Sequence, residues 1–583
     1  MSARTSINEF PGGLETAYRA TLESLAREEA VARLLRRDAS LWKQDPGHQK
    51  IILNRLGWLS SPRWLESKIG ELTAFASEIR SEGFTRVLLL GMGGSSLAAD
   101  VLAEVMAPSP GAPTLEVLDS TDPAAIRASE ASHRLDRTFF LVSSKSGRTI
   151  ETLSHYRYFR ARLEETGVAD PARRFAAITD PGSALDRLAS EEGMRRVFLN
   201  PADIGGRYSA LSYFGMVPAA LLGLNLKAFA ESAARAAEAC GDPDPARNDA
   251  LRLGALLGAA ARAGRDKLTL LTVPSLRPLG YWIEQLVAES TGKEGLGIVP
   301  VEGEPPGFAR YYSEDRCFAC LTLASEPAAE LVQLGVELRQ TGAPWIEIGL
   351  SRRAELAGEF YRWEVATAIA GAVLGIDPFD EPNVQESKDN TATILAQIEK
   401  TGAAPEGESR AREEDILVYA SDKLWDRLTS RTPGHPSLEM LIGRLLALKR
   451  SGDYLAILAY VERTAGTESA FAQLRREIRD AIRIPVLQGY GPRFLHSIGQ
   501  LYKGGPKTGI FLQITSSAPE DLPIPGSRIT FGKLKLAQAL GDLQALDARG
   551  KPALRLHIAG SVARGLATIA QAVERALVAI PQT

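Results

Sequence analysis

The chain has 583 residues, of which 45% are hydrophobic and 24% charged, and its formal net charge is −3. That length exceeds what one hydrophobic core organises and predicts about three or more domains. The near-neutral charge provides no overall attraction to nucleic acid or to an anionic membrane. No apolar run reaches the ~18 residues of a spanning helix, and the first residues lack the apolar core of a signal peptide. We therefore expect a soluble cytoplasmic protein.

Helical and strand-like segments alternate along most of the chain. The first 80 residues carry apolar side chains at helical spacing. Segments 85–105 and 138–159 each begin with an apolar strand, continue through a turn rich in Gly or Ser and end in a helix, and 267–291 repeats this order with a Pro-marked turn. Such alternation predicts an α/β fold with parallel sheets flanked by helices.

A further α/β unit follows a polar segment. Residues 400–415 contain Gly, Pro and a charge cluster, which is typical of a linker, and apolar strands are expected again at 454–461, 509–515 and 553–560. We therefore expect N-terminal helices with a first α/β domain (1–235), a second α/β domain (236–400), a linker (401–415) and a C-terminal α/β module (416–583).

The turn in "LLLGMGGSSL" (88–97) lies between a predicted strand and a predicted helix. Gly93 and Gly94 permit positive φ and close backbone approach, and the N-terminus of the following helix attracts an anion. The spacing matches neither a G-x-G-x-x-G motif nor a P-loop. The alternative to a ligand-binding loop is a simple tight turn.

The stretch "LVSSKSGRTIETL" (141–153) has the same strand–turn–helix order with more polar groups. Ser144, Ser146 and Thr149 would lie at the carboxyl end of a strand, where hydroxyls and free backbone N–H groups meet the positive end of a helix dipole. A phosphate monoester would engage all of these groups. The structural alternative, a serine-rich N-cap, needs only one hydroxyl.

Two later segments contain candidate catalytic groups. Arg207 follows Gly205 and Gly206 in "GGRYS", so its guanidinium can approach an enediolate or a phosphate, although a surface arginine after a turn fits the same pattern. Glu289 and Gln285 end a mostly apolar helix face. A carboxylate there can be a partly desolvated base with a raised pKa, or simply part of a polar helix terminus.

Three further segments contain residues that fit more than one interpretation. Lys388 lies on roughly the same predicted helix face as Glu381, which fits either a ligand-facing lysine or a solvated face. His496 is one of six histidines and lies in the polar stretch "YGPRFLHSIGQLYKGGPKTG" (490–509), where a purely structural histidine is the alternative. Cys317 and Cys320 form a C-x-x-C, but a strand would point them to opposite faces and nothing nearby completes a zinc site, so we expect two core residues.

Taken in order, "GMGGSSL", "SSKSGRTIET", "GGRYS", "QLVAESTGKEG" and "FDEPNVQESK" resemble the glucose-6-phosphate isomerase family. The likeness is closest to the isomerase half of bifunctional transaldolase/glucose-6-phosphate isomerase proteins, which also resembles "YGPRFLHSIGQLYKGGPKTGIFLQIT", and it extends over nearly the whole chain. Because βα units begin only near residue 85 and match the isomerase at once, we expect no transaldolase barrel here. The resemblance implies two sugar-isomerase (SIS) domains within 1–235 and 236–400. It also implies interconversion of glucose 6-phosphate and fructose 6-phosphate, a homodimer, and no cofactor or metal.

The resemblance also implies roles for individual residues. Glu289 would move a proton between C1 and C2, Arg207 would stabilise the enediolate, Lys388 would lie near the ring oxygen and His496 would assist ring opening. Glu151 would brace the site. The residues expected to bind the substrate lie in turns and at helix ends: Gly94, Ser95, Ser144, Lys145, Ser146, Thr149, Gly206 and Gln285.

The sequence departs from the family pattern at two places. Family members have the histidine between the glutamate and the lysine, but here no histidine lies between Glu289 and Lys388, so the C-terminal module is expected to supply it as His496. Glu381 stands where the family usually has glutamine. We leave it outside the site, because a carboxylate repels a phosphate unless it turns away or pairs with a cation.

Two other functions fit the same motifs. A related sugar-phosphate isomerase would also act on mannose 6-phosphate, a choice that depends on loops the sequence does not place. A non-catalytic sugar-phosphate-binding regulator would need the phosphate loop, but it has no use for Glu289, Arg207 and Lys388 together. All of these functions share a sugar phosphate as ligand.

Overall fold

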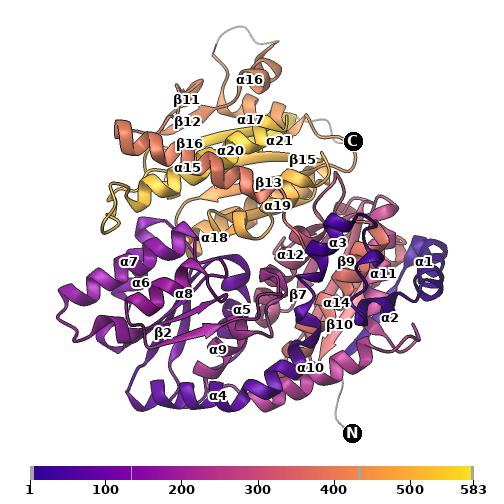
Figure 1. Ribbon diagram of the computed structural model, residues 1–583. Helices are drawn as coiled ribbons and strands as arrows, with labels where there is room; N and C mark the ends of the chain where they lie inside the picture. Colours follow the sequence, from indigo (N-terminus) through magenta and orange to yellow (C-terminus); the bar gives the residue numbers. More distant parts are fainter. Residues whose placement is uncertain (1–4, 133, 431–434, 580–583) are drawn as a thin grey trace.

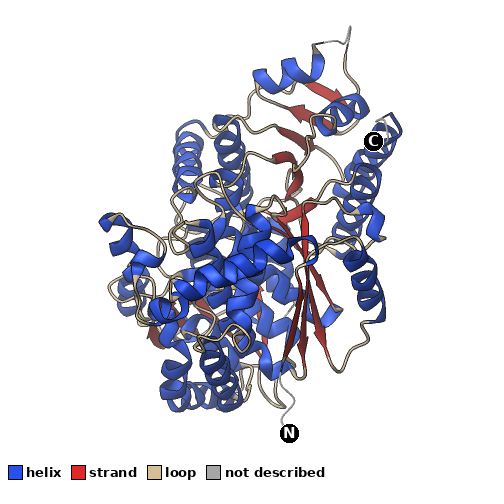
Figure 2. Ribbon diagram, turned by 90° about the vertical axis from the view of Figure 1, so that its right-hand side faces the viewer, coloured by secondary structure: helices blue, strands red, loops and turns tan. Residues whose placement is uncertain are grey.

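Three sheets organise the chain in the computed structural model, which describes residues 5–132, 134–430 and 435–579 (Figure 1). Helices cover the faces of the sheets, and Figure 2 shows strands enclosed between helices. We call the sheets with their helices the first, second and third units, in the order in which their central strands occur along the chain. The expected α/β class with parallel sheets is confirmed.

The first sheet is parallel throughout and has the strand order β3-β2-β4-β5-β6. Its strands are β2 (Arg86–Gly91), β3 (Thr114–Leu118), β4 (Thr138–Ser143), β5 (Phe175–Thr179) and β6 (Arg196–Leu199). The helices of this unit are α5 (Leu97–Val105), α6 (Pro123–Ala131), α7 (Ile150–Glu165), α8 (Ala184–Glu191) and α9 (Tyr213–Leu221). Every residue of β2 and β4 is buried, because both faces are covered, and this explains their continuous apolar runs.

The second sheet has the order β1-β10-β9-β7-β8 and contains a strand that the sequence did not predict. Its parallel strands are β7 (Lys267–Thr272), β8 (Val299–Val301), β9 (Arg316–Leu323) and β10 (Trp345–Leu350). The unpredicted strand is β1 (Ser6–Phe10), which pairs antiparallel with β10. The interpretation of Cys317 and Cys320 as core residues is confirmed, because both are buried, unpaired and part of β9.

Helices from two parts of the chain cover the first two sheets, with Phe75 of the N-terminal helices against Phe139 and Phe198 of the first sheet. The N-terminal helices expected within the first 80 residues are present as α1 (Glu15–Arg27), α2 (Ala30–Leu35), α3 (Pro46–Leu53) and α4 (Ser61–Ser81). The later helices are α10 (Leu226–Cys240), α11 (Asp249–Arg262), α12 (Arg277–Thr291), α13 (Ala329–Gln340) and α14 (Leu356–Leu374).

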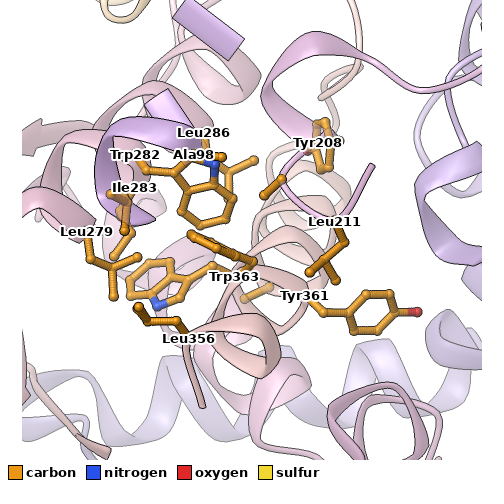
Figure 3. Packing of buried hydrophobic residues seen from close by; sticks show 14 of the residues in the cluster. Ala98, Tyr208, Leu211, Leu279, Trp282, Ile283, Leu286, Leu356, Tyr361 and Trp363 are labelled. Atoms are coloured by element: carbon orange, nitrogen blue, oxygen red, sulfur yellow. The ribbon is translucent and has the colours of Figure 1, made fainter. Parts of the chain in front are cut away.

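A dense aromatic core fixes α12 against α14 (Figure 3). Trp282 of α12 packs edge-to-face on Phe360 of α14, with ring centroids 4.8 Å apart, and Trp363 is completely buried beside them. Leu279, Ile283 and Leu286 continue the same apolar face of α12. Because this face is locked in the core, the carboxyl end of α12 is held in a defined position.

The third sheet has the order β11-β12-β16-β15-β13-β14, in which β12 pairs antiparallel with both β11 and β16 and all other pairs are parallel. Its strands are β11 (Ala411–Glu413), β12 (Ile416–Tyr419), β13 (Tyr454–Tyr460), β14 (Val486–Tyr490), β15 (Gly509–Ser516) and β16 (Ala553–Ile558). The helices are α15 (Val384–Thr401), α16 (Asp422–Thr429), α17 (Leu438–Leu446), α18 (Ala465–Ile482), α19 (Gly499–Gly504), α20 (Phe531–Ala548) and α21 (Val562–Ala579). The strands expected near 454, 509 and 553 are confirmed, whereas the expected linker at 401–415 ends in edge strand β11.

The third unit packs on both of the others (Figure 1). Phe531 and Leu534 of α20 share an apolar cluster with Phe140 and Phe159 of the first unit. A second apolar cluster joins residues of the third sheet and α19 to Ala288, Val299 and Val301 of the second unit. The C-terminal unit is therefore anchored over the junction of the first two. Across the described residues, no helix combines the length and apolarity required to cross a membrane.

Candidate active site

Apart from Lys388, the sequence-predicted polar residues lie where the three units meet. The turns after β2 and β4, the carboxyl end of α12 and the short helix η11 (Arg493–His496) converge there. The carboxyl ends of parallel strands are the edge at which open α/β sheets bind ligands. The position of the candidate site therefore follows from the topology of the first sheet.

The turn between β4 and α7 forms a compact hydroxyl cradle. Ser144 Oγ lies 3.0 Å from Thr149 Oγ1 and accepts a hydrogen bond from the Gly147 N–H at 3.1 Å. Gly147 has φ +65°, and a Cβ there would overlap the backbone of Leu185, so this turn requires glycine. Thr149 is the N-cap of α7 but does not cap its N–H groups with its side chain. Those first-turn N–H groups therefore have no helical acceptor and can serve an anion.

Lys145 and Ser95 lie in these turns but form hydrogen bonds with other parts of the protein. The Lys145 ammonium donates to Asp180 Oδ2 at 2.5 Å and to the carbonyl oxygen of Ala202 at 3.0 Å. The carbonyl oxygen of Ser95 accepts from Ser143 Oγ at 2.6 Å, and the side chain of Ser95 is nearly buried. Ser146 is exposed at the mouth of the turn. Substrate contacts by Lys145, Ser95 and Ser146 stay predictions.

Two glycine-containing turns touch each other at the site. A Cβ on Gly94 would overlap the carbonyl group of Gly206, so the first loop approaches "GGRYS" as closely as backbone permits. A Cβ on Gly206 would instead meet only Gly94 Cα, at 3.9 Å. The close contact fixes the backbone that carries Arg207, and it depends on glycine at position 94.

Arg207 is a buried guanidinium held by several acceptors. Its Nε donates to Ser290 Oγ at 2.8 Å, and its Nη2 donates to the carbonyl oxygens of Pro378 and Asp380 at 2.8 and 2.9 Å. Its Nη1 donates to Glu381 Oε2 at 3.1 Å. A planar group fixed on three sides in this way is pre-organised for a charge that develops nearby.

Glu289 lies beside Arg207 at the end of α12. Its Oε1 is 3.7 Å from Arg207 Nη1, and its Oε2 accepts from Gln285 Nε2 at 3.1 Å. Burial raises the pKa of Glu289; Arg207 opposes this rise and the Glu381 carboxylate adds to it. A desolvated carboxylate with a raised pKa beside a fixed cation matches the chemistry of a general base.

His496 reaches the site from the third unit. Its Nε2 lies 2.8 Å from Glu151 Oε1, and its backbone oxygen accepts from Gln285 Nε2, also at 2.8 Å. Burial by itself would raise the pKa of Glu151, but the charge and hydrogen bond of His496 outweigh it, and the pKa lies below its usual value. One histidine therefore contacts both α7, which follows the hydroxyl cradle, and α12, which carries the candidate base.

The same carboxylate has a second donor from the third unit. Gln538 of α20 donates from Nε2 to Glu151 Oε1 at 2.7 Å and accepts from Thr121 Oγ1 at 2.8 Å. Arg493, on the same short helix as His496, donates to Asp119 at 2.8 Å and to Asp100 at 2.6 Å in the first unit. These contacts position the histidine. Arg493 lies in the polar stretch around His496 that the sequence already indicated, whereas the sequence carried no local signal for Gln538.

Glu381 is a correction to the sequence interpretation. We left it outside the site, but it accepts from Arg207 and lies near enough to Glu289 to raise its pKa. Its charge is tolerated because Arg207 pairs with it. Lys293, which follows Glu289 by four residues and was also not singled out, is buried and donates to Asp380 Oδ1 at 2.6 Å.

Lys388 is not brought into this cluster. It lies on α15, its side chain is exposed, and within the described ranges it forms no hydrogen bond or ion pair with the other candidate residues. The start of α15 does approach the site, because Asn383 bonds to Gln500 through both its N–H and its side-chain oxygen, each at 2.8 Å. The proposed role of Lys388 near the ring oxygen stays a prediction.

Comparison with a family model and with solved structures indicates the class of protein. The family model of phosphoglucose isomerase matches residues 74–296. Among solved structures, a hypothetical protein from Thermus thermophilus superposes with a TM-score of 0.59 at 23% identity, covering 67% of this chain and 100% of that one. A glucose-6-phosphate isomerase from Chlamydia trachomatis superposes with a TM-score of 0.52 at 18% identity, covering 67% of this chain and 87% of that one. Fold and site together define a protein of the phosphosugar isomerase class.

The family follows from sequence identity. Glucose-6-phosphate isomerase of Symbiobacterium thermophilum is 30% identical over 394 residues, which is 58% of this chain and 87% of the relative. The chain belongs to the glucose-6-phosphate isomerase family, and the expectation of an isomerase enzyme is confirmed. About two fifths of the chain lies outside that alignment.

Proposed function

We propose that the chain interconverts glucose 6-phosphate and fructose 6-phosphate through an enediolate, with Glu289 as the base. The observation that carries this proposal is the buried Glu289 carboxylate, hydrogen-bonded by Gln285 and 3.7 Å from the Arg207 guanidinium. An aldose–ketose isomerisation needs one base that serves two adjacent carbons and a cation for the enediolate oxygens.

The phosphate is anchored by the hydroxyl cradle. Ser144, Thr149 and the free N–H groups at the start of α7 bind its oxygens, and Ser146 closes the mouth of the turn. His496, held by Glu151, transfers a proton to or from the ring oxygen and so opens the sugar ring. The anchor and the ring-opening group act on neighbouring parts of the substrate, because the ring oxygen is attached to C5, next to the phosphate-bearing C6, and because Glu151 follows Thr149 at the start of α7.

Proton transfer then takes place on the open chain. Glu289 removes the C2 proton of the aldose, the C1 carbonyl oxygen takes up the negative charge, and Arg207 stabilises that charge. Return of the proton to C1, with transfer of the O2 proton to O1, yields the ketose. Gln285 orients the carboxylate through its bond to Glu289 Oε2.

The test of this assignment is a coupled fructose 6-phosphate to glucose 6-phosphate assay. We expect Glu289→Gln to lower kcat by roughly 10²-fold or more, because a positioned general base typically contributes that much to the rate. Glu330→Gln, a change of the same kind on the exposed surface of α13, is the matched control and keeps wild-type activity. Activity of Glu289→Gln within a few-fold of wild type would remove Glu289 from the mechanism.

The role of the third unit is tested separately with His496→Ala. We expect a loss of kcat with cyclic substrate, because ring opening slows. Full activity of this variant would show that another group opens the ring, and Lys388→Ala then decides whether α15 supplies it.

Two functional alternatives are separated by substrate choice. Competition between mannose 6-phosphate and glucose 6-phosphate in one assay identifies an isomerase of broader specificity. Fructose 6-phosphate binding without turnover would favour the non-catalytic regulator. The contact between Glu289 and Arg207 argues against the regulator, because binding of a phosphate alone has no use for a buried base.

The proposal also covers the relatives of the chain, its domain boundaries and its oligomeric state. We propose that the nearest relatives are the isomerase halves of bifunctional transaldolase/glucose-6-phosphate isomerase proteins, on the strength of the stretch around His496. The homodimer is proposed on the same resemblance, whereas the domain boundaries near residues 235, 400 and 415 are proposed on the sequence pattern. The contacts among Glu151, Gln285, Glu289 and His496 form within one chain, so they do not require a partner subunit.

A further inference from the structure

Three side chains with metal-binding chemistry converge beside the candidate active site. His48 lies on α3, and Asp377 and Asp380 lie on the segment that follows α14. One ligand atom from each, an imidazole nitrogen and two carboxylate oxygens, all lie within 4.8 Å of one another. Side-chain rotation alone can bring such atoms to the spacing of ligands around a single ion.

One carboxylate oxygen of Asp377 has no hydrogen-bond partner in the described part of the chain. The residue is completely buried, and its Oδ1 accepts from the Phe379 N–H at 2.9 Å. Its Oδ2 is also buried but accepts no hydrogen bond from the described part of the chain, and the same holds for His48 Nδ1. Burying a carboxylate oxygen without a partner is costly, so this pair of atoms points to a missing ligand.

The nearby cationic side chains already donate hydrogen bonds to other acceptors. Lys293 donates to Asp380 Oδ1 at 2.6 Å, and Arg207 donates to Ser290, Glu381 and two backbone oxygens. Asp377 is thus a buried acid with no cation bonded to it among the described residues, and one oxygen of Asp380 stays free of Lys293.

We propose that His48, Asp377 and Asp380 bind a first-row divalent metal ion, with Zn²⁺ as the preferred ion. One imidazole and two carboxylates form a ligand set that suits Zn²⁺ and its neighbours, whereas Mg²⁺ and Ca²⁺ favour oxygen alone. The ion neutralises the charge of Asp377, and water completes its coordination.

The site would add a metal link between α3 and the segment after α14, which already share an apolar cluster through Ile52 and Phe379. His48 belongs to an N-terminal helix, whereas Pro378 and Asp380 supply the carbonyl oxygens that hold Arg207. A bound ion therefore ties α3 to the segment that fixes the guanidinium. Its expected effect is to stabilise the folded chain, because a ligand that binds only the folded state raises Tm.

The test measures metal binding directly and does not depend on the isomerase activity. The full chain is stripped with a chelator and titrated with Zn²⁺ by calorimetry, and with Co²⁺ by visible absorption. We expect one ion per chain, a higher Tm with Zn²⁺, and at least about tenfold weaker binding for both His48→Ala and Asp377→Asn. His435→Ala, which removes an exposed histidine elsewhere, is the matched control and binds like wild type.

Each possible result of the titration either supports this site or overturns it. If the wild-type chain binds no Zn²⁺, Asp377 is simply protonated and the proposal fails. Equal affinity in wild type and His48→Ala would place the metal elsewhere and would also overturn it. His48 lies on a helix surface and is only partly buried, so His48→Ala decides the question even if Asp377→Asn does not fold.

Discussion

Replacing Gln538 by leucine tests whether the third unit tunes the carboxylate that holds His496. Gln538 donates to Glu151 Oε1 at 2.7 Å, and leucine keeps the volume but removes the donor. A hydrogen bond to a charged group is worth about 1.5–3 kcal/mol. Since one pKa unit corresponds to about 1.4 kcal/mol, the pKa of Glu151 is expected to rise by roughly one to two units.

The sign of the pH effect follows from the charged form of Glu151. The lost donor stabilised the carboxylate, so Gln538→Leu favours the protonated acid at higher pH. Protonated Glu151 no longer stabilises a charged His496. The acidic limb of the kcat profile should therefore move upward by about the same one to two units.

The assay is kcat against pH in the coupled reaction, with Tm measured alongside. Gln544→Leu is the matched control, because it makes the same change on the exposed face of the same helix, α20. A purely structural role for Gln538 would lower Tm and leave the acidic limb in place. Superimposable pH profiles of Gln538→Leu and wild type would refute the reasoning.

Two further variants address the base and the close glycine contact. Glu381→Gln removes a charge that raises the pKa of Glu289, so the acidic limb of kcat/KM should move to lower pH; an unchanged or upward-shifted limb would contradict the coupling. Gly94→Ala adds a methyl group that overlaps the Gly206 carbonyl, so Arg207 should shift and kcat should fall by about 10²-fold, as when a catalytic group is misplaced by about 1 Å. Wild-type activity of Gly94→Ala would show that the two loops are free to separate.

Local sequence was sufficient for the parts of the site that form locally. The strand–turn–helix order around Ser144 and Thr149 predicted an anion cradle, and the structure places these hydroxyls 3.0 Å apart. The apolar face ahead of Glu289 left two interpretations open, a polar helix terminus or a desolvated carboxylate with a raised pKa, and burial does raise the pKa of Glu289. In both cases, one element and its own turn determine the geometry.

Contacts between distant segments could not be predicted in this way. Gln538 reaches Glu151 only because α20 packs on the first unit, and the two residues are 387 positions apart in sequence. Glu381 belongs to the site because Arg207, 174 positions away, neutralises it. Strand β1 was missed for a related reason, since it is a short edge strand that forms only by pairing with β10. Periodicity within a segment contains no information on such partners.

The position of His496 late in the chain has a consequence for biosynthesis. Ribosomes deliver a protein from its N-terminus, and domains generally fold as they emerge. The phosphate cradle, Arg207 and Glu289 are therefore complete well before His496 and Gln538 leave the ribosome. A nascent or prematurely terminated chain would retain the residues proposed for anchoring and proton transfer, but it would lack the histidine proposed to open the ring. With these proposed roles, full activity with cyclic sugars becomes available only when translation is nearly finished.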